Sequence, residues 1–267
     1  MQRDNSKKSI GIFDSGIGGL TVVKEIVNLL PGEKLVYLGD TARVPYGIKS
    51  KDTVIRYALS NAEFLLSKGI KILVVACNTA SAYSLDTLKE KLSIPVIGVI
   101  DPGAKKAAES TRNGKIAVIG TPSTIRSEAY PRALSKINPE LRIYSKACPL
   151  FVPLAEEGWH YGKITREIIE KYLEDIKKED VDVIILGCTH YPLLKSAIQE
   201  VAGEKVLLID SAEEIAMEIS VKINKSNNTE EIVDENEYYL TDVSESFIRI
   251  AGKFLGKELK EVNLTDL

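Results

Sequence analysis

The stretch Ile72-Leu-Val-Val-Ala-Cys-Asn-Thr79 occurs twice in this chain, the second time in the related form Val183-Ile-Ile-Leu-Gly-Cys-Thr-His190. Each copy begins as a run of aliphatic, mostly β-branched residues, short enough for a buried parallel strand. Each run ends in a small residue, a cysteine and two polar residues. In an open α/β sheet this point is the carboxyl end of a strand, where ligands bind. Cys77 and Cys188 lie too far apart in the chain for one local motif, but two similar halves could bring them face to face.

The two copies belong to a degenerate internal repeat. Both halves are predicted to run strand, helix, strand, a loop with Val-Pro, helix, cysteine strand, helix and a strand ending in Ile-Asp. This order predicts two pseudo-symmetric α/β domains with open, mostly parallel sheets and an active site in the cleft between them. The tail after Ser211 has no counterpart in the first half, and we expect it to pack on the first domain. The predicted domains are residues 1–100 with 211–267, and residues 101–210.

Four local predictions concern the segments that connect the strands. Pro95–Ile100 is predicted to be a strand, and a single helix is expected after Thr124, up to about Ile137. Cys148–Gly158 is predicted to be a loop. The polar stretch at residues 224–231 predicts a surface loop.

The composition is that of an ordinary globular protein. The 267 residues are 44% hydrophobic and 27% charged, with a net charge of −3, so no basic surface for nucleic acid is expected. Three cysteines cannot form a closed set of disulfides, and the first nine residues lack the apolar core of a signal peptide. No apolar run approaches the roughly 20 residues that span a membrane. We therefore expect a soluble cytoplasmic protein with reduced cysteines and without a nucleic-acid or membrane partner.

A pair of cysteines at matching strand ends suits a reaction that needs a base and an acid on opposite faces of one carbon. The pKa of a thiol, ordinarily near ~8.5, falls beside a helix N-terminus or a cation and rises in apolar or anionic surroundings. One cysteine could therefore be a thiolate while the other is a thiol, and such a pair could racemise or epimerise a substrate. Two ordinary buried core cysteines are the alternative, but the matching positions favour the catalytic interpretation.

The residues beside the two cysteines indicate an anionic substrate. Asn78 and Thr79, and likewise Thr189 and His190, place side-chain donors and free helix N–H groups next to each thiol, which suits a carboxylate. His190 could also assist proton transfer at Cys188, or it could only satisfy a loop carbonyl. The sequence thus predicts a carboxylate site between the two strand ends.

Asp14 and Ser15 follow another predicted strand, Ile10–Phe13, at the end that should lie beside the first cysteine. Asp14 could accept a hydrogen bond from an ammonium group or orient a thiol, and capping the next helix is the alternative role. Cys148 precedes a proline in a loop without polar partners, and we interpret it as structural. His160, beside Trp159, is expected at the surface or in packing.

The glycine-rich turn Gly16-Ile-Gly-Gly-Leu-Thr21 is similar to a dinucleotide-binding fingerprint, with Asp40 placed for the acidic residue about 20 positions further on. Thr21 stands at the third glycine position, however, and Asp14 would face the pyrophosphate with a like charge. We therefore interpret the turn as a tight connection with close helix packing. No group of His, Cys and carboxylates has metal-ligand spacing, no Walker loop is present and no lysine lies in a pyridoxal context, so neither a cofactor nor a metal is expected.

Four motifs span most of the chain. They are Gly11-Ile-Phe-Asp-Ser-Gly-Ile-Gly-Gly-Leu20, Pro45-Tyr-Gly47, Ala76-Cys-Asn-Thr-Ala80 and Gly187-Cys-Thr-His-Tyr-Pro-Leu193. Together they resemble the glutamate racemases of the cofactor-independent aspartate/glutamate racemase superfamily, and the histidine of the last motif is typical of the glutamate-directed members.

The resemblance implies interconversion of L- and D-glutamate without a cofactor, supplying D-glutamate for peptidoglycan synthesis, by a homodimeric enzyme. By the family's pattern Cys77 would take the α-proton of the D isomer and Cys188 that of the L isomer, with Asp14 and His190 assisting. Glu156, or its neighbour Glu157, falls where the family places an acid near the second thiol. The residues implied to bind the substrate are Asp14, Ser15, Tyr46, Gly47, Asn78, Thr79, Thr121, Thr124, Thr189 and His190.

Three other functions remain open on the sequence. An aspartate-type racemase would use the same pair of cysteines. A hydrolase or amidotransferase with one cysteine nucleophile would also place it at a strand end, and would form a covalent acyl intermediate. A non-catalytic amino-acid-binding protein would use the same two-domain cleft, but would leave the α-proton of its ligand unexchanged.

Overall fold

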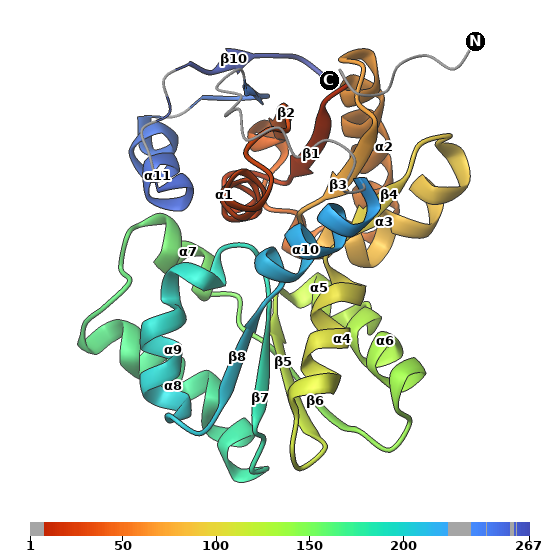
Figure 1. Cartoon of the computed structure of the whole chain (residues 1–267). Helices are drawn as coiled ribbons and strands as arrows, with labels where there is room; N and C mark the ends of the chain where they lie inside the picture. The colour runs from red at the N-terminus through yellow and green to blue at the C-terminus, as the bar shows by residue number, and fades with distance from the viewer. Residues whose placement is uncertain (1–7, 224–235, 244, 257–258, 260) are drawn as a thin grey trace.

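The chain forms two sheets of parallel strands, and one sheet lies above the other in Figure 1. The structure is a computed structural model that describes residues 8–223, 236–243, 245–256, 259 and 261–267. Within these residues the first sheet has six strands in the order β10-β9-β2-β1-β3-β4 and the second has four in the order β6-β5-β7-β8. Every strand pair is parallel. The predicted α/β class is therefore confirmed.

The strands keep close to the predicted runs. The first sheet consists of β1 (Ile10–Asp14), β2 (Leu35–Gly39), β3 (Ile72–Val75), β4 (Val96–Gly98), β9 (Glu237–Leu240) and β10 (Asn263–Leu264). The second consists of β5 (Lys115–Gly120), β6 (Arg142–Ala147), β7 (Val183–Gly187) and β8 (Leu207–Asp210). Because β9 pairs with β2, the tail of the chain extends the first sheet.

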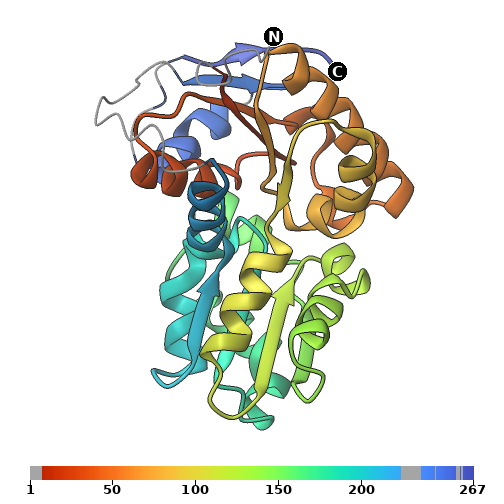
Figure 2. The ribbon, with the colours of Figure 1, turned by 45° about the vertical axis from the view of Figure 1, so that its right-hand side comes forward.

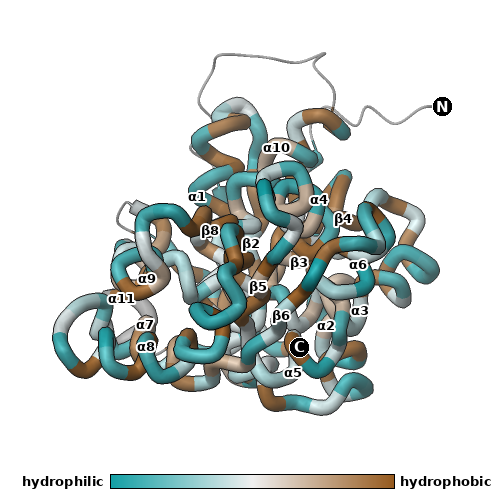
Figure 3. Tube along the Cα trace, turned by 90° about the horizontal axis from the view of Figure 1, so that it is seen from below, coloured by the Kyte–Doolittle hydropathy of each residue, from teal (hydrophilic) through white to brown (hydrophobic). Residues whose placement is uncertain are grey.

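Helices cover both faces of each sheet. Around the first sheet lie α1 (Leu20–Leu29), α2 (Lys51–Ser67), α3 (Asn78–Lys91), α10 (Ser211–Ile223) and α11 (Glu245–Leu255), with the short 3₁₀ turns η2 (Thr41–Arg43) and η3 (Tyr46–Ile48). Around the second lie α4 (Ile100–Ser110), α5 (Pro122–Arg126), α6 (Ala129–Ile137), α7 (Phe151–Glu156), α8 (Lys163–Lys178) and α9 (Lys195–Ala202), with the 3₁₀ turn η4 (Tyr191–Leu194). In Figure 3 the hydrophobic colour gathers on the strands at the centre of the view, while the surrounding helices carry most of the hydrophilic positions.

Successive side chains of a strand point to opposite faces of its sheet, and this alternation explains why helices cover both faces. In β1, Ile10 and Ile12 pack on the face covered by α1, α10 and α11, and Phe13 packs on the face covered by α2 and α3. In β7, Ile184 packs towards α8 and α9, whereas Ile185 packs towards α4 and α6. Strands that are buried on both faces have continuous aliphatic sequences. The strands before Cys77 and Cys188 could therefore be predicted from the sequence.

The chain crosses between the two sheets after β4 and again after β8, and α4 and α10 contact one another at this junction (Figure 2). Parallel sheets present the carboxyl ends of all their strands at one edge. The edges of both sheets that carry these ends face the junction, so the polar turns that follow β1, β3, β5 and β7 are brought together.

Three local predictions were wrong. The strand at Pro95–Ile100 is shorter, because α4 already begins at Ile100; Asp101 and a proline lie in its first turn, where both favour a helix start. The two Ile-Asp pairs are therefore not equivalent, since only the second ends a strand.

The single helix expected after Thr124 is split into α5 and α6 by Glu128, whose φ of 55° is left-handed. The predicted loop at Cys148–Gly158 contains the helix α7. The polar stretch at 224–231 lies outside the described residues. Among the residues that are described, none of the helices combines the length and the apolarity of a transmembrane segment.

Candidate active site

A pocket of about 300 Å³ lies between the two sheets, at the carboxyl ends of their strands. Cys77, which follows β3, and Cys188, which follows β7, both line it. The two cysteines are almost equally buried, with 6% and 7% of their residue surfaces exposed. A larger hollow of about 690 Å³ lies at the opposite edge of the second sheet, next to Asp180 and Lys205, and contains neither cysteine. The smaller pocket is therefore the candidate active site.

Cys77 is the residue before α3, and its sulfur accepts a hydrogen bond from the N–H of Ala80 at 3.5 Å. Its thiol donates to Oγ of Ser15 at 3.6 Å. Burial, and to a smaller extent the negative charge of Asp14, raise the pKa of Cys77 to about 12. Cys77 is therefore a thiol at neutral pH.

Cys188 lies at one end of a row of three polar side chains. Its sulfur is 3.9 Å from Nδ1 of His190, and Nε2 of the same ring is 3.0 Å from Oε1 of Glu156. Burial alone would lower the pKa of His190, but the hydrogen bonds to Cys188 and Glu156 and their charges outweigh burial and raise it to about 10. The imidazole is therefore a cation at neutral pH. Of the two adjacent acids, the structure places Glu156 at the histidine, whereas Glu157 is exposed.

Asp14 is fully buried at the end of β1, behind the pocket rather than on its wall. Its carboxylate accepts hydrogen bonds from the N–H of Gly16 at 3.0 Å and from the hydroxyl of Thr189 at 3.4 Å. Burial raises its pKa, and the nearby His190 acts in the opposite direction. Asp14 thus accepts hydrogen bonds from the second cysteine turn and from the glycine turn that precedes α1, and it acts on Cys77 through its charge.

The glycine turn packs directly against the second cysteine turn. A Cβ atom on Gly18 would lie 2.2 Å from Oγ1 of Thr189 and 2.7 Å from Nδ1 of His190. Only glycine leaves room for this contact. The turn therefore has the close-packing role that the sequence favoured, and Asp40 has other partners.

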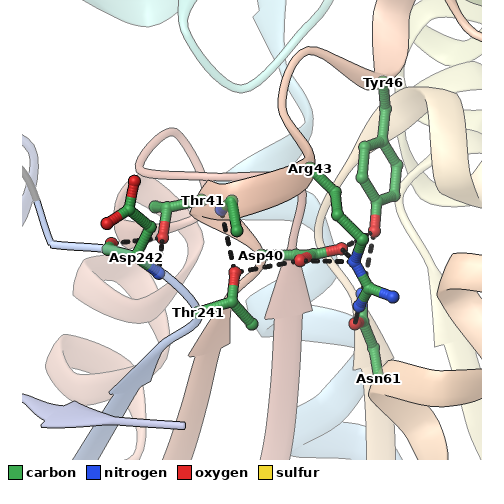
Figure 4. A network of polar contacts seen from close by, with 8 residues as sticks. Asp40, Thr41, Arg43, Tyr46, Asn61, Thr241 and Asp242 are labelled. Carbon is green, nitrogen blue, oxygen red and sulfur yellow. Dashed lines mark hydrogen bonds and ion pairs between the residues drawn. The ribbon is translucent and has the colours of Figure 1, made fainter. Parts of the chain in front are cut away.

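Those partners hold the loop that carries Tyr46 and Gly47 (Figure 4). Asp40 is fully buried and accepts hydrogen bonds from the hydroxyl of Tyr46, from Nε of Arg43 at 2.7 and 2.8 Å, and from the hydroxyl of Thr241 at 3.0 Å. Asn61 donates to the hydroxyl of Tyr46 at 3.1 Å. The tail of the chain, through Thr241, thereby contributes to the position of a pocket loop.

Three threonine hydroxyls meet where the two halves of the pocket touch. Oγ1 of Thr79 lies 2.9 Å from Oγ1 of Thr121 and 2.9 Å from Oγ1 of Thr124, and the latter two are 3.0 Å apart. Thr79 and Thr121 line the pocket, whereas Thr124 lies behind them. The other predicted binding residues that line the pocket are Ser15, Tyr46, Gly47, Asn78, Thr189 and His190.

Sequence reasoning missed the apolar part of the wall. Both Val-Pro pairs of the repeat, at 44–45 and 152–153, line this one pocket, together with Ile48. Their recurrence in the repeat was the signal that could have indicated this position. Cys148, which we interpreted as structural, and His160, which we expected at the surface or in packing, lie outside the pocket. Cys148 is fully buried, and His160 pairs with the carbonyl of Ala155 at 3.2 Å.

Comparisons with known proteins show the family of this chain. Residues 10–219 match the model of the Asp/Glu/Hydantoin racemase family. The chain is 52% identical over 257 residues to the glutamate racemase of Geobacter metallireducens, covering 96% of this chain and 95% of that protein. Its structure is similar to that of glutamate racemase isoform RacE1 from Bacillus anthracis, with a TM-score of 0.91, 42% identity and 98% of each chain covered. It is also similar to glutamate racemase from Francisella tularensis in complex with D-glutamate, with a TM-score of 0.90, 36% identity and 98% of each chain covered.

Proposed function

The chain belongs to the Asp/Glu/hydantoin racemase family and racemises glutamate, and from that premise we propose that Cys77 and Cys188 are the two acid–base groups of the reaction. One observation carries this proposal. The two thiols follow equivalent strands of the two sheets and line one pocket, with almost equal shielding but different neighbours. A two-base racemase needs one group on each face of the α-carbon, in opposite protonation states.

The neighbours set those protonation states. The imidazolium of His190 stabilises negative charge on the Cys188 sulfur 3.9 Å away, while Cys77 keeps its proton because its pKa is raised to about 12. In this form Cys188 takes the α-proton of L-glutamate, the bonding electrons remain on the α-carbon, and Cys77 returns its own proton to the opposite face. The product is D-glutamate. The reverse reaction starts with the proton on Cys188 and the negative charge on Cys77.

Three further groups support the transfer. Glu156 holds the imidazole ring of His190, Asp14 acts on Cys77 through its charge, and the donors at the start of α3 bind a carboxylate of the substrate. The other proposed binding residues are Ser15, Tyr46, Gly47, Thr79, Thr121, Thr124 and Thr189.

The cellular role and assembly extend the same proposal. Three free cysteines are typical of a protein from a reducing compartment, which supports a cytoplasmic location. The family resemblance supports a homodimer that supplies D-glutamate for peptidoglycan. The two sheets and the two chain crossings support domains at residues 1–100 with 211–267 and at residues 101–210.

Incubation with L-glutamate in deuterated water, without any cofactor, tests the proposal. We expect α-deuterium in the amino acid by NMR and a loss of optical rotation. Cys77→Ser and Cys188→Ser should each abolish racemisation, whereas Cys148→Ser should retain it. A fully active Cys77 or Cys188 variant would refute the two-base assignment. A covalent acyl-enzyme in mass spectra would favour the hydrolase instead, and binding without exchange would favour the amino-acid-binding protein.

A further inference from the structure

Tyr130 on α6 touches the turns of both cysteines. Its side chain is buried, with 1% of its surface exposed, and its hydroxyl donates to Oδ1 of Asn78 at 2.7 Å. Asn78 immediately follows Cys77 and lines the pocket. The ring also lies against Gly187, which immediately precedes Cys188: a Cβ atom on that glycine would be 3.2 Å from Cε2 of Tyr130.

The position of the ring is fixed at the junction of the two sheets. On its other side lies Gly103 of α4, where a Cβ atom would be 3.6 Å from Cε1 and from the hydroxyl of Tyr130. The hydroxyl is also 3.0 Å from Oγ of Ser211, the first residue of α10. Tyr130 therefore packs between both segments through which the chain crosses from one sheet to the other.

This contact decides which end of the Asn78 amide faces the substrate. A side-chain amide has one accepting oxygen and one donating NH₂ group. The hydroxyl of Tyr130 occupies the oxygen of Asn78, and Ser211 can donate to the oxygen of Tyr130, so neither contact uses the NH₂ group. The NH₂ group is left as the end of Asn78 that can donate into the pocket.

We propose that Tyr130 is a positioning residue that fixes the amide of Asn78 with its NH₂ group directed at a carboxylate of glutamate. The inference rests on the proposed racemase function, because it assigns a role in binding the substrate of that reaction. Tyr130 itself does not touch the substrate. Its role is to exclude the flipped amide, in which an acceptor oxygen with partial negative charge would face the carboxylate.

Tyr130→Phe removes only the hydroxyl and keeps the ring in its position between Gly103 and Gly187. We expect KM for L- and D-glutamate to rise about 5- to 10-fold with a smaller change in kcat, since a lost neutral hydrogen bond weakens binding by about that factor. Tyr161→Phe is the matched control, because Tyr161 is 73% exposed and outside the pocket, and its KM should equal that of the unmodified protein.

A double-mutant cycle with Asn78→Ala separates positioning from general support of the fold. If Tyr130 acts through Asn78, then Tyr130→Phe adds no further rise in KM once Asn78 is alanine. Additive effects on KM, or an unchanged KM in Tyr130→Phe, would overturn the proposal.

Asn78→Asp tests the orientation without altering the tyrosine. It places a carboxylate where the NH₂ group should be, so KM should rise more than in Asn78→Ala. A KM below that of Asn78→Ala would mean that an oxygen of Asn78 faces the substrate, and would overturn the proposal. An unmodified protein that exchanges no α-deuterium contradicts the proposed function instead, so the two failures are distinguishable.

Discussion

Oε1 of Glu156 lies 3.0 Å from Nε2 of His190, and this contact leaves Nδ1 as the ring nitrogen that faces Cys188. The side chain of His190 is 7% exposed, whereas that of Glu156 is 38% exposed. Glu156, which is partly exposed, thus helps to keep the buried His190 protonated beside the thiol of Cys188. Because solvent screens Glu156, its effect on the histidine should be moderate rather than absolute.

Glu156→Gln should lower the pKa of His190, which the hydrogen bonds and the charges of Cys188 and Glu156 raise to about 10. The sign follows from the loss of a negative charge that favours the imidazolium, and we expect a decrease of about one pH unit. The chain has two histidines, so NMR of ¹⁵N-labelled imidazole in a His160→Gln background reports on His190 alone. Glu157→Gln is the matched control, and a midpoint that moves equally in both variants would contradict the role of Glu156.

Gly18→Ala should destabilise the protein and displace the second cysteine turn. The added Cβ would lie 2.2 Å from Oγ1 of Thr189, and overpacking of this kind costs about 1–3 kcal/mol. At Gly16 the same change would meet only Cγ1 of Val44 at 3.5 Å, an ordinary contact. Thermal denaturation should therefore show a lower Tm for Gly18→Ala and a nearly unchanged Tm for Gly16→Ala. Equal melting temperatures for the two variants would count against close packing in this turn.

Thr241→Val tests the link between the tail and the pocket loop. It removes the hydrogen bond to Asp40 at 3.0 Å and the one from the N–H of Ala42 at 2.9 Å. We expect a loss of about 1–2 kcal/mol, seen as a Tm lower by roughly 2–4 °C for each kcal/mol. Thr265→Val is the control, since within the described part of the chain Thr265 pairs through its backbone N–H, with the carbonyl of Leu240 at 2.9 Å. A Tm as high as that of the control would show that the tail contact adds nothing.

The cysteine turns were predictable because their signal is local. An aliphatic run, a small residue, a cysteine and polar residues together specify a strand end, and parallel sheets gather such ends at one edge. The same reasoning failed at Ile100, because an apolar run followed by Asp and Pro fits the end of a strand as well as the first turn of a helix. The helix α7 was not predicted because Pro149 and Pro153 are typical of a loop. Proline is tolerated in a first helical turn, however, and Pro153 lies in the first turn of α7.

Contacts between distant segments could not be read from the sequence. Asp40 meets Thr241 only because β9 pairs with β2, and Tyr130 reaches Asn78 only because α6 packs beside the crossing helix α4. Such contacts depend on strand order and helix packing, which the periodicity of one segment does not encode. The sequence therefore predicted most of the polar residues that line the pocket, but not the residues that hold them in place.

Alkylation of the three cysteines compares their environments in a single experiment. Cys77 and Cys188 are almost equally exposed, at 6% and 7%, so a difference in their rates reports on charge rather than access. Iodoacetamide reacts with the thiolate. Near neutral pH we expect Cys188, beside the imidazolium of His190, to react first. The rate at Cys77, whose pKa is raised to about 12, should climb steadily as the pH rises towards that value.

Substitutions of the neighbours should move the two rates independently, as measured by mass spectrometry of the labelled peptides. His190→Asn removes the cation and should slow only Cys188. Asp14→Asn removes a negative charge that raises the pKa of Cys77, so it should lower that pKa and speed up Cys77. Cys148 is fully buried, with its pKa also raised to about 12, and serves as the unreactive internal reference. If Cys77 reacted before Cys188 near neutral pH, the negative charge would reside on the first thiol, and the proposed resting state would have to be reversed.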